Sequence, residues 1–193
     1  MFSDKWRREL FTIPNLLSLF RILLIPVYIT IYLNAADHRQ HLLAGLILAL
    51  SCLTDMADGI IARKFHMITN VGKLLDPLAD KLTQLALILS LSAKYPVLYP
   101  VLALFLGKEL FQCFALVMFA QKGKMLTGAL MAGKLCTTVL FSSLILLVLL
   151  PELRQETVSA LTVIDGGFLL YSLVSYVTAY FGKSSCLTDL NRE

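Results

Sequence analysis

Six long apolar segments run along this chain, and short polar breaks separate them. The segments occupy residues 11–34, 41–62, 74–94, 96–121, 128–151 and 156–181. Each is close to the roughly 20 residues that a helix needs to cross a bilayer. The pattern therefore predicts an all-α integral membrane protein with six transmembrane helices. We expect one domain over residues 1–193, since the length suits a single domain.

The composition agrees with a membrane protein. Hydrophobic residues make up 58% of the chain and charged residues only 16%, whereas soluble domains are about 25% charged. The net charge of +4 suits contact with anionic lipid or phosphate, but the cations are scattered, which argues against a nucleic-acid partner. The four cysteines show no metal-binding spacing and are interpreted as small apolar residues.

The distribution of Lys and Arg predicts the orientation. Ten of the 17 fall on one side of the expected membrane, three on the other and four inside spans, so the positive-inside rule places both termini in the cytoplasm. Residues 1–10 lack a cleavage site and resemble a short interfacial amphipathic helix, with Phe2, Trp6 and Leu10 toward lipid. We expect a multi-pass protein of the plasma membrane.

Four aspartates flank the second polar break. Asp55 and Asp58 are three residues apart, and Asp76 and Asp80 are four apart, so each pair shares one helix face. The pairs lie on neighbouring antiparallel helices, whose faces can converge. Carboxylates in membrane helices are costly, at about 2.5–3.5 kcal/mol each at mid-bilayer on insertion scales. Hard oxygen ligands at this density suit Mg²⁺, Mn²⁺ or Ca²⁺, and two such ions could bridge a pyrophosphate.

Other interpretations of these acids remain open. They could be structural acids in salt bridges, with Arg63 and Lys81 as the available cations. They could also mark the path of a divalent-cation carrier or belong to a silent helical scaffold, although a carrier should have acids at several depths. Gly59 and Gly72 would let a bulky ligand approach the backbone, or could allow close helix contact. The clustering beside Arg63 favours an anionic ligand that bridges metal ions.

The stretch from Asp55 to Asp80 also resembles a known signature, D-x2-D-G-x2-A-R-x8-G-x3-D-x3-D, of the CDP-alcohol phosphotransferase family. The matching positions are Asp55, Asp58, Gly59, Ala62, Arg63, Gly72, Asp76 and Asp80. The resemblance implies that the aspartates hold two metal ions, Mg²⁺ or Mn²⁺, and that Asp80 is the general base. It implies that Gly59, Ala62, Arg63 and Gly72 line a site for the CDP moiety. It also implies a homodimer.

The segment Phe11–Arg21 resembles the start of bacterial phosphatidylglycerophosphate synthases. Asn15, Ser18 and Arg21 lie at i, i+3 and i+6 and point roughly one way. We assign Asn15 and Ser18 to the CDP site and Arg21 to the phosphate of the acceptor. The alternative is that Asn15 caps the helix and the others are ordinary polar groups.

Charged residues in later spans bear on the acceptor alcohol. Lys108-Glu109 and Lys134 stand where these synthases carry Arg-Glu and Lys, which implies, together with Arg21 and Lys81, binding of a phosphorylated acceptor such as glycerol 3-phosphate. Lys108 could instead pair with Glu109, and Lys134 could extend to the interface. Lys108 lacks the bidentate fork of Arg. The same framework serves cardiolipin synthases that act on phosphatidylglycerol, and transferases for inositol phosphate or serine, so these acceptors stay open.

Overall fold

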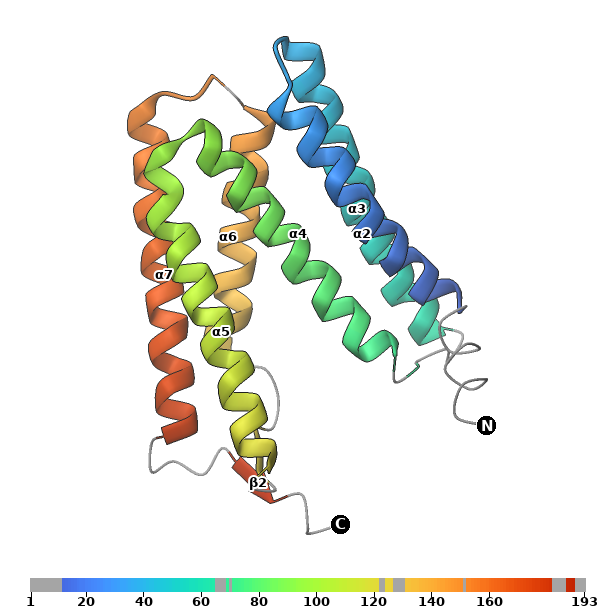
Figure 1. Ribbon diagram of the computed structural model, residues 1–193, viewed down its shortest axis with the longest axis vertical. Helices are drawn as coiled ribbons and strands as arrows, with labels where there is room; N and C mark the ends of the chain where they lie inside the picture. Colours follow the sequence, from blue (N-terminus) through green and yellow to red (C-terminus); the bar gives the residue numbers. More distant parts are fainter. Residues whose placement is uncertain are drawn as a thin grey trace. The chain divides into compact units, whose positions relative to one another are not determined.

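The structure is a computed structural model that describes residues 12–64, 69, 71–121, 124–126, 131–150, 152–181 and 187–189 (Figure 1). For part of these it describes the backbone alone, namely residues 13, 14, 38, 55–63, 73, 74, 120, 124–126 and 187–189. The interfacial helix expected at residues 1–10 lies outside the described residues. The described chain divides into two compact units, which are taken in turn.

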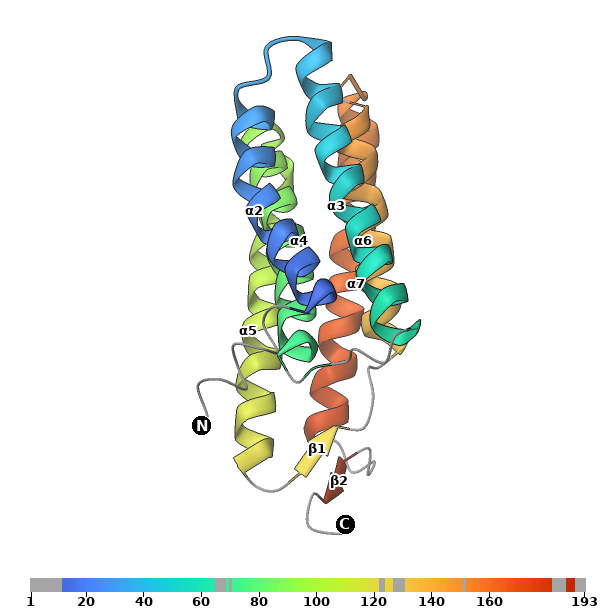
Figure 2. The same ribbon diagram turned by 90° about the vertical axis from the view of Figure 1, so that its right-hand side faces the viewer.

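The first unit is built from three helices. They are α2 (Ile13–Leu33), α3 (His38–Lys64) and α4 (Gly72–Lys94). A short turn joins α2 to α3, and the two helices pack side by side along their length (Figures 1 and 2). The core contains Tyr28, Leu48, Ala79 and Leu87, all at most 4% exposed. Small residues such as Ala44 and Ala79 are fully buried, as expected where membrane helices approach closely.

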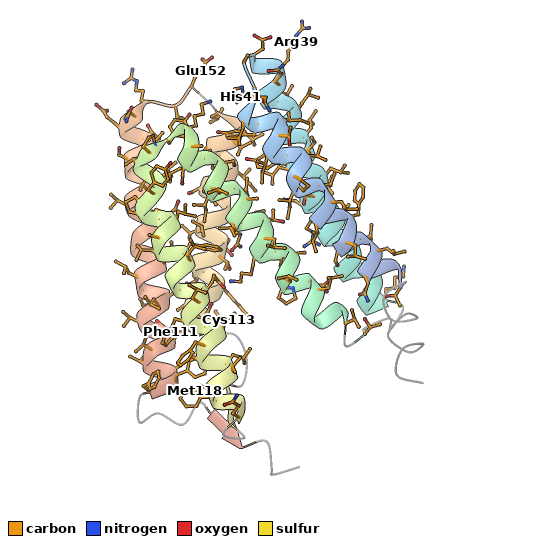
Figure 3. All side chains as sticks on the ribbon, viewed as in Figure 1. Arg39, His41, Phe111, Cys113, Met118 and Glu152 are labelled. Atoms are coloured by element: carbon orange, nitrogen blue, oxygen red, sulfur yellow. The ribbon has the colours of Figure 1, made fainter. Side chains whose placement is uncertain are left out.

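The second unit contains three further long helices. Its elements are η1 (Pro96–Leu98), α5 (Tyr99–Gln121), β1 (Lys124–Leu126), most of α6 (Met131–Leu149), α7 (Gln155–Phe181) and β2 (Leu187–Asp189). Aromatic side chains join α5 to α7, with Phe111 against Phe181 at 6.4 Å and Phe119 against Tyr180 at 5.0 Å between ring centroids. Figure 3 shows Phe111 and Met118 along this part of α5.

The six expected helices are all present in the described chain, and each differs from its predicted bounds by a few residues. Four of them are long and apolar enough to cross a membrane by length and composition: α2, η1 with α5, α6 and α7. The exceptions are α3 and α4. The described side chains of α3 give a shorter apolar segment, Arg39–Thr54, and α4 carries Asp76, Asp80 and Lys81 within its length. The aspartates therefore lower the apolar character of these two helices.

Two details differ from the sequence-based expectation. A short antiparallel pair adds to the helices: β1 pairs with β2, with Lys124 opposite Asp189 (Figure 2). The helix α3 begins at His38, three residues before the predicted start of this span at residue 41, so that His41 lies in its first turn (Figure 3). The reason is local, because the Gln40 side chain accepts the backbone N–H of Ala36 at 2.6 Å and so starts the helix earlier.

Candidate functional site

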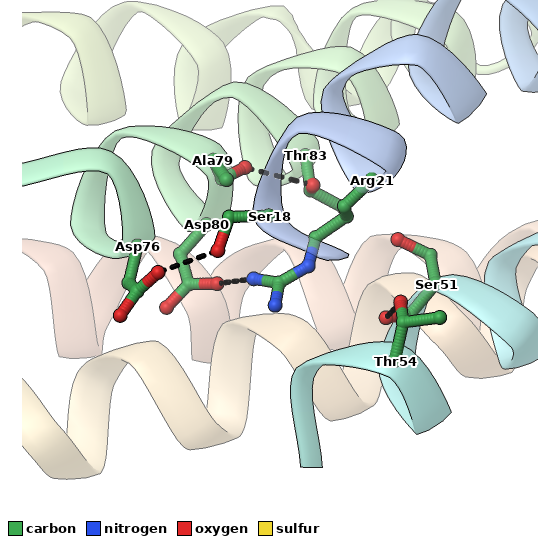
Figure 4. Close-up of polar contacts among 8 residues, drawn as sticks. All are labelled: Ser18, Arg21, Ser51, Thr54, Asp76, Ala79, Asp80 and Thr83. Atoms are coloured by element: carbon green, nitrogen blue, oxygen red, sulfur yellow. Dashed lines mark hydrogen bonds and ion pairs between the residues drawn. The ribbon is translucent and has the colours of Figure 1, made fainter. Parts of the chain in front are cut away.

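The polar face of α2 contacts two of the four predicted aspartates (Figure 4). The Ser18 hydroxyl donates to Oδ1 of Asp76 at 2.6 Å. One turn further along both helices, Nη1 of Arg21 donates to Oδ1 of Asp80 at 2.5 Å, which is also an ion pair. The spacing of three residues on α2 thus matches the spacing of four on α4, because both correspond to about one helical turn.

The two partners of the ion pair differ greatly in exposure. The side chain of Arg21 is 2% exposed, whereas that of Asp80 is 52% exposed. Asp76 is half-buried, and Ser18 is completely buried. Each carboxylate is therefore held from the α2 side, and Asp80 keeps a large open surface on which a ligand could bind.

A third polar contact joins the start of α2 to the start of α4. Nδ2 of Asn15 donates to Oγ1 of Thr69 at 3.0 Å, and the backbone N–H of Gly72 donates to the same oxygen at 2.9 Å. Thr69 thereby caps the first turn of α4. A Cβ atom on Gly72 would stand only 2.6 Å from Oδ1 of Asn15. The glycine is thus required by close packing against α2.

The other two predicted ligands lie on α3, where the structure describes their backbone alone. Asp55 and Asp58 follow Ser51 by four and seven residues, so the three share one helix face. Ser51 is 5% exposed, and with Tyr28 and Thr83 it lines a cavity between α2, α3 and α4. This cavity measures about 10 Å³, close to the minimum for one water molecule. The space between the three helices at this point therefore holds about one water molecule.

Among the side chains that the structure describes, no three carboxylate, imidazole or thiolate groups gather for a metal ion. This does not test the predicted metal site, because the side chains of Asp55 and Asp58 lie outside that part. The same holds for Gly59, Ala62 and Arg63, whose place on α3 is known only from the backbone. Their assignment to the CDP site stays a prediction.

The residues assigned to the acceptor phosphate are divided between the two compact units. Arg21 forms an ion pair with Asp80. Lys81, which follows Asp80 on α4, is half-buried. Lys108 and Lys134 belong to the second unit. Lys108 is 2% exposed, and its Nζ donates to Glu109 at 2.7 Å and to Gln112 at 3.1 Å. Lys134 is exposed on α6. The pairing of Lys108 with Glu109, which the sequence left open, is thus present.

Two further polar groups of the second unit make contacts between helices. Asp165 is completely buried on α7, and one of its oxygens accepts a hydrogen bond from the Ser143 hydroxyl on α6. The hydroxyl of Tyr176 fills the space beside Gly133, where a Cβ atom would stand 2.6 Å from it. Nζ of Lys108 lies 6.0 Å from the centre of the Tyr176 ring. Tyr176, which lies on α7, thus contacts residues of both α5 and α6.

Comparison with known proteins decides the family. Residues 11–177 match the family model described as CDP-alcohol phosphatidyltransferase. The chain belongs to this family. A relative from Shigella flexneri serotype 5b, named CDP-diacylglycerol–glycerol-3-phosphate 3-phosphatidyltransferase, is 30% identical over 173 residues, which cover 88% of this chain and 94% of the relative.

Relatives with the same name give shorter matches. The one from Rickettsia bellii is 44% identical over 86 residues, and the one from Bacillus subtilis is 39% identical over 84. These matches cover 44% and 38% of this chain, and the chain spans about half the length of each of these relatives, 46% and 44%. The CDP-alcohol phosphatidyltransferase match itself extends over helices of both compact units.

Thr69 takes part in the contact between α2 and α4, and no role for it was predicted from the sequence. Thr69 joins Asn15 to Gly72, yet it lies between the two halves of the aspartate signature. The signal that could have found it is a Thr shortly before a predicted helix, since a capping hydroxyl commonly accepts the backbone N–H of a residue two or three positions later. The cap interpretation of Asn15 is not what the structure has, since Asn15 bonds to Thr69 instead.

Proposed function

We propose that this chain transfers the phosphatidyl group of CDP-diacylglycerol to glycerol 3-phosphate, giving phosphatidylglycerophosphate and CMP. The family match over residues 11–177 and the printed name of the Shigella relative support the reaction. The observation that carries it in the structure is the carboxylate pair of α4. Asp76 and Asp80 are held one turn apart by α2, and Asp80 remains half-exposed to a ligand.

The donor chemistry of this pair fits a divalent metal site. Carboxylate oxygens are the ligands that Mg²⁺ and Mn²⁺ prefer, and we propose Asp55, Asp58, Asp76 and Asp80 as the set. Two ions bound there would supply positive charge to the pyrophosphate of the substrate and to the departing CMP oxygen. Divalent-metal dependence is general in this family.

The lengths of the helices support a common position along the helix axes for the aspartates of α3 (Asp55 and Asp58) and those of α4 (Asp76 and Asp80). Ser18 lies 15 residues before the end of α2 at Leu33, which is about 22 Å at 1.5 Å per residue. Asp55 lies 17 residues after the start of α3 at His38, which is about 25 Å. Because α2 and α3 pack side by side and are joined by a short turn, Asp55 and Ser18 fall at similar heights.

The chain's own residues then have defined tasks. Asp80 accepts the proton of the acceptor hydroxyl, whose oxygen forms a bond to the phosphorus that bears diacylglycerol. The bond between that phosphorus and the CMP oxygen breaks, so that CMP leaves with the electron pair. Gly59, Ala62, Arg63 and Gly72, with Asn15 and Ser18 nearby, would border the CDP moiety. Lys108, Lys134, Arg21 and Lys81 are the cations proposed for the acceptor phosphate.

Orientation and assembly belong to the same proposal. The ten cations on one side of the expected spans place the aspartate level, and hence the reaction, at the cytoplasmic face of the cell membrane. We propose a homodimer, on the family resemblance alone. CDP-diacylglycerol and the acceptor phosphate would then meet at the same membrane surface, where one is anchored by its acyl chains and the other is dissolved.

The test is CMP release by the purified protein in detergent with CDP-diacylglycerol and Mg²⁺ or Mn²⁺. Glycerol 3-phosphate, phosphatidylglycerol, inositol, inositol phosphate and serine are supplied in parallel. Release that requires both metal and glycerol 3-phosphate supports the proposal, and Asp80→Asn should reduce it by at least about 10²-fold, since a positioned base contributes about 10²–10⁴. Release with phosphatidylglycerol alone would make the protein a cardiolipin synthase. No release with any acceptor, from folded protein, would refute the transferase assignment.

A further inference from the structure

Polar contacts join α2 to the α4 segment at four levels. Asn15 bonds to Thr69 just before α4, Ser18 to Asp76, Arg21 to Asp80 and Tyr28 to Ser90, the last at 3.2 Å between hydroxyl oxygens. The four α2 side chains are 1%, 0%, 2% and 4% exposed. The partners follow one another in the same order along both segments, so α2 and α4 run in the same direction. The carboxylate contacts are thus two of the four levels of this polar seam.

The burial within this seam separates residues that can meet a substrate from those that cannot. Arg21 is 2% exposed and Ser18 is completely buried, so neither has a free surface for a dissolved phosphate or a nucleotide. The side chain of Asp80, by contrast, is 52% exposed. The guanidinium fixes the direction of a bound carboxylate well, because it is planar and its donors have a rigid geometry.

We infer that Ser18 and Arg21 are positioning residues, which fix the carboxylates of Asp76 and Asp80 and act on the substrates only through them. The inference rests on the proposed function, keeps its reaction and replaces two of its residue roles. It assigns Arg21 to the general base in place of the acceptor phosphate, and Ser18 to a metal-ligating carboxylate in place of the CDP moiety. Side chains that hold metal ligands typically contribute 10–100-fold to metal affinity or activity.

The kinetic test compares Arg21→Gln and Arg21→Lys with the wild-type protein. If Arg21 positions Asp80, the Gln variant should lose about 10–100-fold in kcat, while the KM for glycerol 3-phosphate changes by less than about threefold. The Lys variant should recover part of kcat, since it keeps the charge but loses the fork. If Arg21 binds the acceptor, KM for glycerol 3-phosphate should rise about tenfold or more at nearly unchanged kcat, and that result would overturn the assignment.

Ser18 offers a test that needs no turnover. The stabilisation of the substrate-free protein by Mn²⁺ is measured as the rise in Tm against metal concentration. Ser18→Ala should weaken the apparent Mn²⁺ affinity about tenfold, and Ser18→Thr, which keeps the hydroxyl, should restore it. Equal affinity in the wild type and the Ala variant would overturn the role of Ser18. Ser90→Ala is the matched control, because it removes a seam contact far from the carboxylates and should leave the Mn²⁺ affinity unchanged.

The experiments distinguish failure of the proposed function from failure of the positioning inference. If the proposed function is wrong, the wild-type protein itself releases no CMP with glycerol 3-phosphate. If only the positioning inference is wrong, the wild type is active and the loss in Arg21→Gln appears in KM. Should Arg21→Gln fail to fold, Arg21→Lys carries the same comparison of kcat with KM, because a partial loss confined to kcat supports positioning and a loss confined to KM refutes it.

Discussion

Replacing Gly72 by alanine forces a methyl group into the contact between the start of α4 and α2. The new Cβ atom would stand 2.6 Å from Oδ1 of Asn15 and 3.1 Å from Oγ1 of Thr69, whereas ordinary contacts begin at about 3.4 Å. Asn15 is 1% exposed and bonded to Thr69, so its amide has little room to withdraw. We expect a loss of about 1–3 kcal/mol in the free energy of unfolding, the usual cost of overpacking a core.

The same change should lower activity more than stability alone explains. Gly72 lies about one turn before Asp76, so a shift of roughly 0.8 Å at the contact moves the carboxylates relative to α2. Misplacement of catalytic groups by about 1 Å can cost about 10²-fold in rate. CMP release at saturating substrates measures this effect, and thermal unfolding in detergent, followed by circular dichroism, measures stability.

Two controls make the reasoning refutable. Gly167→Ala is the matched change at a helical glycine with no atom within 4 Å of the new Cβ, so it should be neutral or slightly stabilising. In an Asn15→Ala background, Gly72→Ala should cost much less than in the wild type, because its main clash is gone. If Gly72→Ala costs the same in both backgrounds, or nothing in either, then contact with Asn15 is not what requires the glycine.

Three other outcomes follow from the described contacts. Asp165→Asn should stay within about 1 kcal/mol of wild-type stability because it still accepts the Ser143 hydrogen bond, whereas Asp165→Ala should cost about 1–3 kcal/mol; equal Tm values for the two variants would contradict this. Gly133→Ala should lower the Tm, and adding Tyr176→Phe should recover part of the loss, because the closest contact of the new Cβ atom is with the Tyr176 hydroxyl; an unchanged Tm in Gly133→Ala alone would refute the clash. Removal of divalent ions by EDTA should abolish CMP release, and added Mg²⁺ or Mn²⁺ should restore it; full activity in EDTA would exclude the metal requirement.

The helices could be predicted from the sequence because apolar segments of this length have few alternatives in a bilayer. The bounds of α2 and α7 differ by at most two residues from the predicted spans. The β1–β2 pair could not be predicted, since it joins segments more than 60 residues apart and each has only three paired residues. The ion pair of Lys108 with Glu109 was one interpretation that the sequence left open, and the structure contains this ion pair.

The polar face of α2 shows why the candidate site could be predicted only in part. Periodicity places Asn15, Ser18 and Arg21 on one face, which is correct, but it is equally compatible with a cap, a nucleotide contact or a phosphate contact. What separates these options is the partner of each side chain, and the partners lie 54 to 59 residues away. The side chain of Arg21 is charged and suits phosphate by type alone, yet its 2% exposure and its bond to Asp80 favour a fixed counter-ion. Residue type predicted the chemistry of the site, and burial decides which residues can perform it.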